Sequence, residues 1–181
     1  MRVGAIVIDM SPDTPWAASN RVDPVQLVHE NLFGRLARRA LDQAIDSRTI
    51  KPQWNTLVGN LYPHLTRRQF PKPVAELRSD EQQKRQYAQQ LSPRLVEQTG
   101  NPGDWMYPQY DLANTVADSL AEYILFAYGR AVVPDLLDAL SEYQAWEEVV
   151  VAVFAIAPEQ FTAEWHAYLQ QYYPIDLAQP Y

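Results

Sequence analysis

The chain has 181 residues, of which 47% are hydrophobic, and its formal net charge is −7. This length and composition allow one domain with a buried hydrophobic core. The absence of cysteine excludes disulfides, thiolate metal sites and cysteine nucleophiles.

Charge is distributed unevenly along the chain. Residues 1–98 contain 14 lysines and arginines against 10 acidic residues, whereas residues 99–181 contain Arg130 against 12 acidic residues. Such an acidic C-terminal half disfavours nucleic acid as a partner. The longest apolar run, residues 149–157, is far shorter than the roughly 20 residues that cross a bilayer. We therefore expect no transmembrane segment.

The first 65 residues are predicted to form one strand and two helices. The apolar, β-branched run at 3–9 is typical of a short buried strand. Asp23-Pro24 is typical of a helix start, and the helix is expected to continue to about Ile45. Its inner face is predicted to carry Leu27, Phe33, Leu36, Ala40 and Leu41. A second, shorter helix at 52–65 is expected to end at Pro63.

Residues 66–109 are polar and rich in proline, which indicates an irregular insertion containing one helix near residues 79–91. The loop at its end, 103–110, places Trp105, Tyr107 and Tyr110 close together. Clustered aromatic side chains can bind a partner, or they can fold back as a lid over the core.

The C-terminal part, residues 110–174, is predicted to be a compact four-helix region. Apolar residues recur at helical spacing in 111–129, and Gly129 is suited to a C-terminal cap. Two short helices at 133–143 and 145–156 are followed by one that Pro158 begins. The inner face of the first helix is expected to hold Leu112, Val116, Leu120, Tyr123, Ile124 and Ala127. That of the last is expected to hold Phe161, Trp165, Tyr168, Leu169 and Tyr172.

A series of packing motifs runs through residues 123–169. These motifs are Tyr128-Gly129, Leu136-Leu137-Asp138-Ala139-Leu140, Trp146-Glu147-Glu148, Phe161, Glu164-Trp165 and Tyr168-Leu169. The series resembles the C-terminal helical region of peptidase-MA-like (gluzincin) metallopeptidases. Two segments precede these motifs in the chain: the helix with His29-Glu30 and then PQWNTLVGNLY. Their order is the one that this family requires.

The resemblance implies a mainly α fold in which a short N-terminal strand precedes a gluzincin-like helical domain. We interpret residues 1–181 as a single domain made of 1–65, the insertion 66–109 and the C-terminal region 110–174. An exported or envelope-associated location is suggested by the family alone.

Zinc catalysis in this family uses the motif H-E-x-x-H and a glutamate from a later helix. His29 stands at the first ligand position and Glu30 at the position of the general base. Phe33 replaces the second ligand, and Val58 (or Leu57, in a shifted alignment) replaces the third. We therefore expect no metal, no cofactor and no catalytic residue, with His29 and Glu30 as remnants.

The resulting hypothesis is a non-catalytic pseudo-peptidase domain that acts as an interaction or scaffold module. Its binding candidates are Arg35, Arg38 and Arg39, together with the aromatic residues at 105, 107 and 110. The expected partner is a protein, or the rest of a longer precursor. The alternative is a zinc metallopeptidase with unusual ligands, which would recruit His64 or Glu76. His166 is predicted to lie on the surface.

Overall fold

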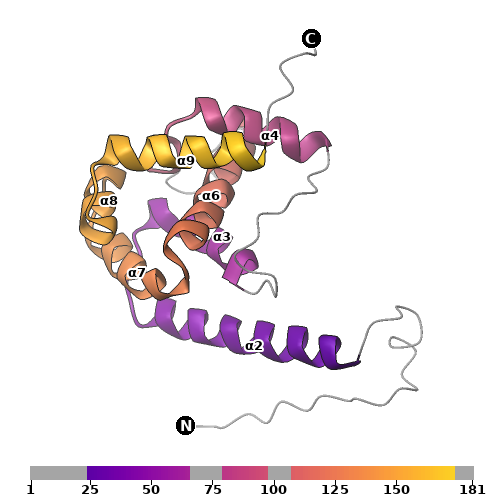
Figure 1. The fold of residues 1–181 in the computed structure, drawn as a ribbon. Coiled ribbons are helices and arrows are strands. Elements are labelled where there is room, and N and C mark those ends of the chain that lie inside the picture. The colour runs from indigo at the N-terminus through magenta and orange to yellow at the C-terminus, as the bar shows by residue number, and fades with distance from the viewer. Residues whose placement is uncertain (1–23, 66–78, 98–106, 174–181) are drawn as a thin grey trace.

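The computed structural model describes residues 24–65, 79–97 and 107–173, and these residues form a mainly α-helical structure (Figure 1). The strand expected at 3–9 lies outside the described residues. Side chains are not described for some helical positions, among them residues 24–31 and 107–111.

The N-terminal helices lie close to their predicted positions. Helix α2 spans Pro24–Asp46, the short 3-10 helix η1 spans Pro52–Trp54, and α3 spans Asn55–Leu65. The prediction that Pro63 ends the second helix was wrong, because α3 continues for two more residues. A proline lacks one backbone donor, and in the last turn of a helix this loss affects a single hydrogen bond.

The predicted inner face of α2 was too broad. Leu41 is buried, but Leu36 is 51% exposed and Ala40 is exposed as well. Successive residues of an α-helix are rotated by about 100°, so Leu36 and Leu41 are separated by about 140° and point in different directions. Leu27 and Phe33 have side chains outside the described set.

The insertion contains α4 (Ser79–Gln90), which confirms the helix expected near residues 79–91, and the single turn α5 (Arg94–Glu97). Helix α4 is composed almost entirely of polar residues. Among its described side chains, residues 84–90, the buried ones are Arg85 and Ala88.

Helix α6 (Tyr107–Tyr128) begins earlier than predicted, so Tyr107 and Tyr110 belong to its first turn instead of a loop. Pro108 allows this start because proline is well tolerated in the first turn of a helix. Trp105 lies outside the described residues.

Helix α6 is the centre of the fold, and α3, α4, α5 and α9 (Pro158–Tyr172) pack around it (Figure 1). Its surface is therefore buried on most sides, and the only exposed position of the predicted stripe is Ala127, near its C-terminal end. The buried residues of α6 are Ala113, Thr115, Val116, Ala117, Ser119, Leu120, Ala121, Glu122, Tyr123, Ile124 and Leu125.

The four helices of the C-terminal region follow the predicted order. After α6, Gly129 adopts a φ of 76° and donates its backbone N–H to the Leu125 carbonyl, as expected for a glycine at this position. The chain then forms η3 (Arg130–Val132), α7 (Val133–Glu142), α8 (Trp146–Phe154) and finally α9.

Aromatic residues hold this C-terminal region together. The ring of Phe161 is fully buried, and its centroid lies 5.3 Å from that of Tyr123, 5.4 Å from that of Trp146 and 4.9 Å from that of Phe154. These edge-on and tilted contacts are the arrangements that aromatic rings prefer. One ring on α9 thereby links α6 and α8.

The segment before α3 closes the C-terminal end of α7. The backbone N–H of Lys51 donates to the Leu140 carbonyl at 3.3 Å, and the indole Nε1 of Trp54 donates to the Tyr143 carbonyl at 3.0 Å. These bonds satisfy carbonyl groups that the end of a helix leaves without partners. Trp54 also packs against Trp146, so the N-terminal and C-terminal segments share one hydrophobic core.

Candidate functional site

The structure places the expected zinc-ligand positions in two helices. His29 and Glu30 lie in the first half of α2, and their side chains are outside the described set, as is that of Phe33. Val58 and Leu57 lie in α3, and both are buried in the hydrophobic core. Helix α3 packs mainly along α6. An apolar side chain inside the core offers no atom to a metal, so this residue set does not fit a family-type zinc site.

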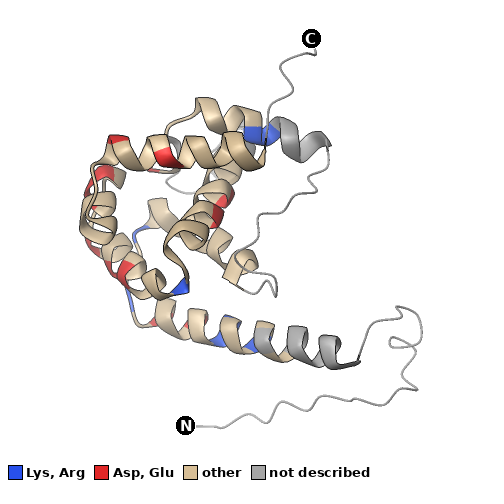
Figure 2. Cartoon of the chain, in the orientation of Figure 1, with Lys and Arg blue, Asp and Glu red and all other residues tan. Residues whose placement is uncertain are grey.

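The arginines predicted as a basic cluster lie in α2, where Figure 2 shows basic residues, and they differ in their contacts. The Nε atom of Arg38 lies 3.8 Å from a carboxylate oxygen of Asp42, and its guanidinium lies 5.0 Å from the ring centroid of Tyr62. Arg35 and Arg39 are exposed, and neither pairs with a side chain that the structure describes. Only Arg38 is thus engaged within the described part of the chain.

The aromatic candidates are not brought to this surface by any described contact. Tyr107 and Tyr110 contribute backbone to α6, and their side chains remain outside the described set. The prediction that the aromatic segment binds a partner therefore stays a prediction.

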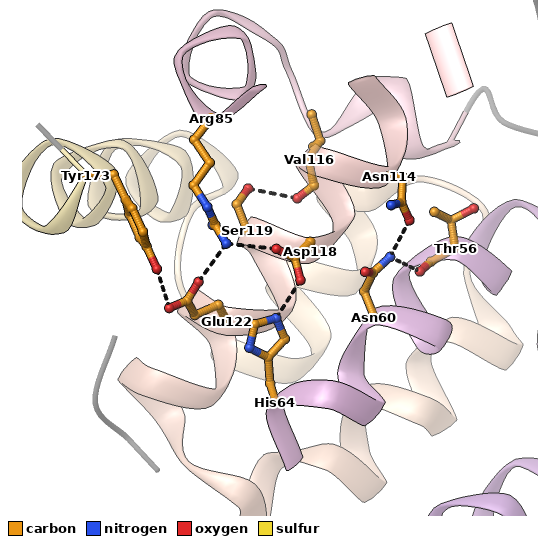
Figure 3. A network of polar contacts seen from close by, with 10 residues as sticks. All are labelled: Thr56, Asn60, His64, Arg85, Asn114, Val116, Asp118, Ser119, Glu122 and Tyr173. Atoms are coloured by element: carbon orange, nitrogen blue, oxygen red, sulfur yellow. Dashed lines mark hydrogen bonds and ion pairs between the residues drawn. The ribbon is translucent and has the colours of Figure 1, made fainter. Parts of the chain in front are cut away.

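A mostly buried network of charged and polar side chains around α6 is the most distinctive polar feature of the described residues (Figure 3). Its first centre is Asp118. One of its carboxylate oxygens lies 2.7 Å from Nε2 of His64, and the other accepts a hydrogen bond from Nη2 of Arg85 at 2.8 Å. His64 comes from α3 and is 2% exposed, while Arg85 comes from α4 and is 3% exposed. Asp118 thereby joins three helices.

The α3–α6 contact extends one turn towards the N-terminus of both helices. There the Nδ2 atom of Asn60 donates to the Asn114 side-chain oxygen at 2.9 Å (Figure 3). Because Asn60 precedes His64 by four residues and Asn114 precedes Asp118 by four, the two helices run in the same direction over this stretch. Polar pairs thus fix the register of α3 on α6.

The second centre of the network is Glu122, one turn after Asp118 on α6. Its Oε2 atom lies 3.1 Å from Nη2 of Arg85, and its Oε1 atom accepts a hydrogen bond from the Tyr173 hydroxyl at 2.6 Å. The ring of Tyr173 also covers the guanidinium of Arg85, 4.3 Å from the ring centroid. Two carboxylates and one aromatic face therefore enclose a single guanidinium.

Only one of the three guanidinium nitrogens of Arg85 makes polar contacts with the described residues. Its Nη2 atom makes both ion pairs, whereas Nε and Nη1 are buried and have no hydrogen-bond partner among the described residues. The Tyr168 hydroxyl is buried too, and it lies close to Glu122. Burial, followed by the negative charge of Glu122, raises the pKa of Tyr168 well above its usual range, so this hydroxyl stays protonated.

His166 does not occupy the surface position predicted for it. The residue is half-buried beside the Trp165 ring, and its Nε2 atom is buried without a partner among the described residues. Burial lowers the pKa of His166 below its ordinary value because the charged imidazolium is poorly solvated there. The prediction failed because the buried side of α9 is wider than the spacing of its apolar residues indicates.

The chemistry of the α6 network is the recognition of a guanidinium by carboxylates. The alternative ligand His64 has its Nε2 atom directed at Asp118, and Glu76 lies outside the described residues. Within the described ranges, no three histidine, aspartate or glutamate side chains are grouped as metal ligands. No described helix has the length and apolar character needed to cross a membrane.

Sequence reasoning missed Arg85, Asp118 and Glu122 as site residues. One signal was present, because Asp118 and Glu122 are spaced by four in a stretch of α6 rich in apolar residues and must share one face of the helix. The position of Arg85 carries no such signal, since it lies in a polar helix where every arginine would be expected to face solvent.

Comparison of the chain with protein-family models, curated proteins and solved structures finds no match.

Proposed function

We propose that the chain is a non-catalytic, gluzincin-like (pseudo-peptidase) domain that acts as an interaction or scaffold module. The observation that carries this proposal is the burial of Val58, which is 7% exposed at the position of the third zinc ligand. Its neighbour Leu57 is fully buried too, so either alignment places an apolar core residue there. A position that would hold a metal ligand in a peptidase serves packing in this chain.

The docking surface of the module is the outward face of α2, which we define by Leu32, Arg35, Leu36 and Arg39. At about 100° per residue these four positions share one side of the helix, opposite the buried Leu41. The two leucines are 37% and 51% exposed, and the two arginines are exposed as well. Leucines one turn apart with flanking arginines form an amphipathic contact surface.

The charge of this surface indicates the chemistry of its partner. Arg35 and Arg39 have no ion pair with a described side chain, in contrast to Arg38, which contacts Asp42 and Tyr62. A complementary partner brings carboxylates to the two guanidiniums and apolar side chains to the leucines. We therefore assign an acidic, amphipathic helix of another protein as the occupant, bound side by side with α2.

Site-specific photo-crosslinking tests this assignment in cells that produce the protein. A photoreactive phenylalanine derivative replaces Leu36 in one variant and Val151, an equally exposed apolar residue of α8, in the control. We expect a discrete adduct from position 36 and none from position 151. The linked segment, sequenced by mass spectrometry, should be rich in aspartate or glutamate with apolar residues at helical spacing.

A charge reversal provides the second arm of the experiment. The double change Arg35→Glu and Arg39→Glu should abolish the adduct, whereas Arg48→Glu, in the loop after α2, should preserve it. An adduct that survives the double reversal, or one that forms equally from both crosslinker positions, would overturn the assignment. Peptide hydrolysis that depends on Glu30 and on bound zinc would replace the whole proposal with the metallopeptidase alternative.

A further inference from the structure

The contact between α4 and the rest of the molecule depends on an arginine instead of an apolar stripe. Of the described α4 side chains, Ala88 supplies the buried apolar contact, Tyr87 is half-exposed, and Arg85 enters the network on α6. A helix that buries so little apolar surface is held weakly by the hydrophobic effect. Its attachment therefore depends on the ion pairs and the aromatic contact made by Arg85.

The site that receives Arg85, here called the guanidinium slot, is made by residues outside α4. Asp118 and Glu122 come from α6, and Tyr173 follows α9 (Figure 3). His64 contacts Asp118 from the side of α3, which fixes the orientation of that carboxylate. The slot walls are thus supplied by α3 and α6, which pack against each other, and by the residue that follows α9.

Arg85 directs only one of its guanidinium nitrogens to the carboxylates of the slot. A planar guanidinium can give two parallel N–H bonds to one carboxylate, which is its strongest arrangement. In this structure a single Nη2 atom serves both carboxylates, and the buried Nε and Nη1 atoms have no hydrogen-bond partner in the described part of the chain. The Tyr168 hydroxyl is buried as well and lies close to Glu122. Unpaired buried donors weaken the attachment of Arg85.

We propose that the guanidinium slot is an arginine-binding site that Arg85 fills in cis, and that an arginine side chain of another polypeptide fills it when α4 detaches. An incoming arginine is free of the constraint that α4 imposes on Arg85, so it can direct more of its N–H groups to the two carboxylates. This site is separate from the outward face of α2, and it selects a ligand of the opposite charge.

Chemical rescue of the full chain tests the slot. Arg85→Ala removes the cis occupant and keeps a good helix former in α4. The probe is ethylguanidinium chloride, and the readout is the backbone amide shifts of residues 118–122 by NMR. We expect saturable binding to Arg85→Ala that is at least tenfold tighter than to the wild type, where Arg85 competes. Ethylammonium chloride, which has the charge without the planar fork, should give no saturable shift.

Two controls separate the slot from general charge effects. Arg94→Ala removes an exposed arginine that pairs with Glu147, and this variant should bind the probe no better than the wild type. The double variant Arg85→Ala/Glu122→Gln should lose the binding, because one wall of the slot is gone. A folded Arg85→Ala protein that gives only a linear, non-saturable response to ethylguanidinium would overturn the proposal.

The wild-type protein provides a test that does not depend on the folding of any variant. Hydrogen exchange of α4 is measured with and without the peptide acetyl-Gly-Arg-Gly-amide, and with the lysine peptide as control. The arginine peptide should accelerate exchange in α4 and leave α7 and α8 unchanged, since it displaces Arg85. Equal exchange with both peptides at concentrations up to 10-fold above the rescue midpoint would overturn binding in trans.

Discussion

The imidazole of His64 and the carboxylate of Asp118 lie 2.7 Å apart and connect α3 to α6 inside the protein. The second oxygen of the same carboxylate pairs with Arg85 of α4. One side chain on the central helix therefore fixes two neighbouring helices, neither of which is adjacent to it in sequence. Removing its charge should affect both contacts.

We expect Asp118→Asn to lower the free energy of unfolding by roughly 2–4 kcal/mol, because Arg85 then keeps a buried charge with only one carboxylate beside it. Urea unfolding followed by circular dichroism measures the change. The matched control is Glu147→Gln, which breaks the exposed pair with Arg94 and should cost less than about 1 kcal/mol. Equal losses in the two variants would show that the α6 network contributes no more than a surface ion pair.

The sequence predicts helix ends well where the backbone itself dictates them. Gly129 ends α6 because its positive φ suits glycine, and Pro158 begins α9 because its fixed φ suits the first turn of a helix. The inner face of α2 was predicted wrongly, since Leu36 satisfies an apolar pattern yet faces outward. Periodicity identifies an apolar side of a helix, but the packing of other helices decides which side is buried.

The buried network could be predicted only in part, for a related reason. The spacing of Asp118 and Glu122 places both carboxylates on one face of α6. Their partners are remote in sequence, with His64 54 residues and Arg85 33 residues before Asp118. No local pattern can pair such residues, because the pairing results from the tertiary arrangement of the helices.

The half-buried imidazole of His166 predicts that stability decreases in mild acid. Burial lowers its pKa in the folded state, so the unfolded chain binds the proton more tightly. The stabilising contribution is present above the ordinary histidine pKa of about 6.5 and is lost as the pH falls towards the lowered value. NMR titration of the imidazole measures the pKa directly, and a value at or above 6.5 would contradict this prediction.

A His166→Gln variant isolates the contribution of this residue to stability. Its midpoint of urea unfolding should vary less between pH 7 and pH 5 than that of the wild type, because the titrating group is absent. His64→Gln serves as the comparison, since it alters the histidine that contacts Asp118 and leaves His166 in place. If both variants keep the wild-type dependence on pH, the acid sensitivity arises elsewhere in the chain.

Ala155 ends α8 in a left-handed conformation, with a φ of 55° and a ψ of 31°. A Cβ atom is disfavoured in this region, and the side chain of Ala155 is exposed, so glycine removes strain without leaving a cavity. We expect Ala155→Gly to raise the free energy of unfolding by about 0.5–1 kcal/mol. Ala152→Gly, at an exposed position inside α8, should instead lower it by about 1 kcal/mol. Two changes of the same sign would contradict the role of the backbone conformation.

The packing of Val58 predicts that restoring the peptidase motif in this chain will not restore a zinc site. Phe33→His recreates the spacing of H-E-x-x-H on α2, but the third ligand requires Val58→Glu, and Val58 is part of the hydrophobic core. A carboxylate at that position would be desolvated, so we expect the double variant to lose more than about 3 kcal/mol of stability. Elemental analysis should find no stoichiometric zinc in the wild type, in Phe33→His or in the double variant.

Val58→Ala is the control, because it removes packing without introducing a charge and should cost less than Val58→Glu. Unfolding of every variant is compared with and without added zinc, since a metal that binds only the folded state raises its stability. Zinc bound at about one ion per chain in the double variant, with a matching gain in stability, would mean that α2 and α3 still approach each other as in a peptidase. One zinc per wild-type chain would overturn the non-catalytic proposal and favour a metallopeptidase with other ligands.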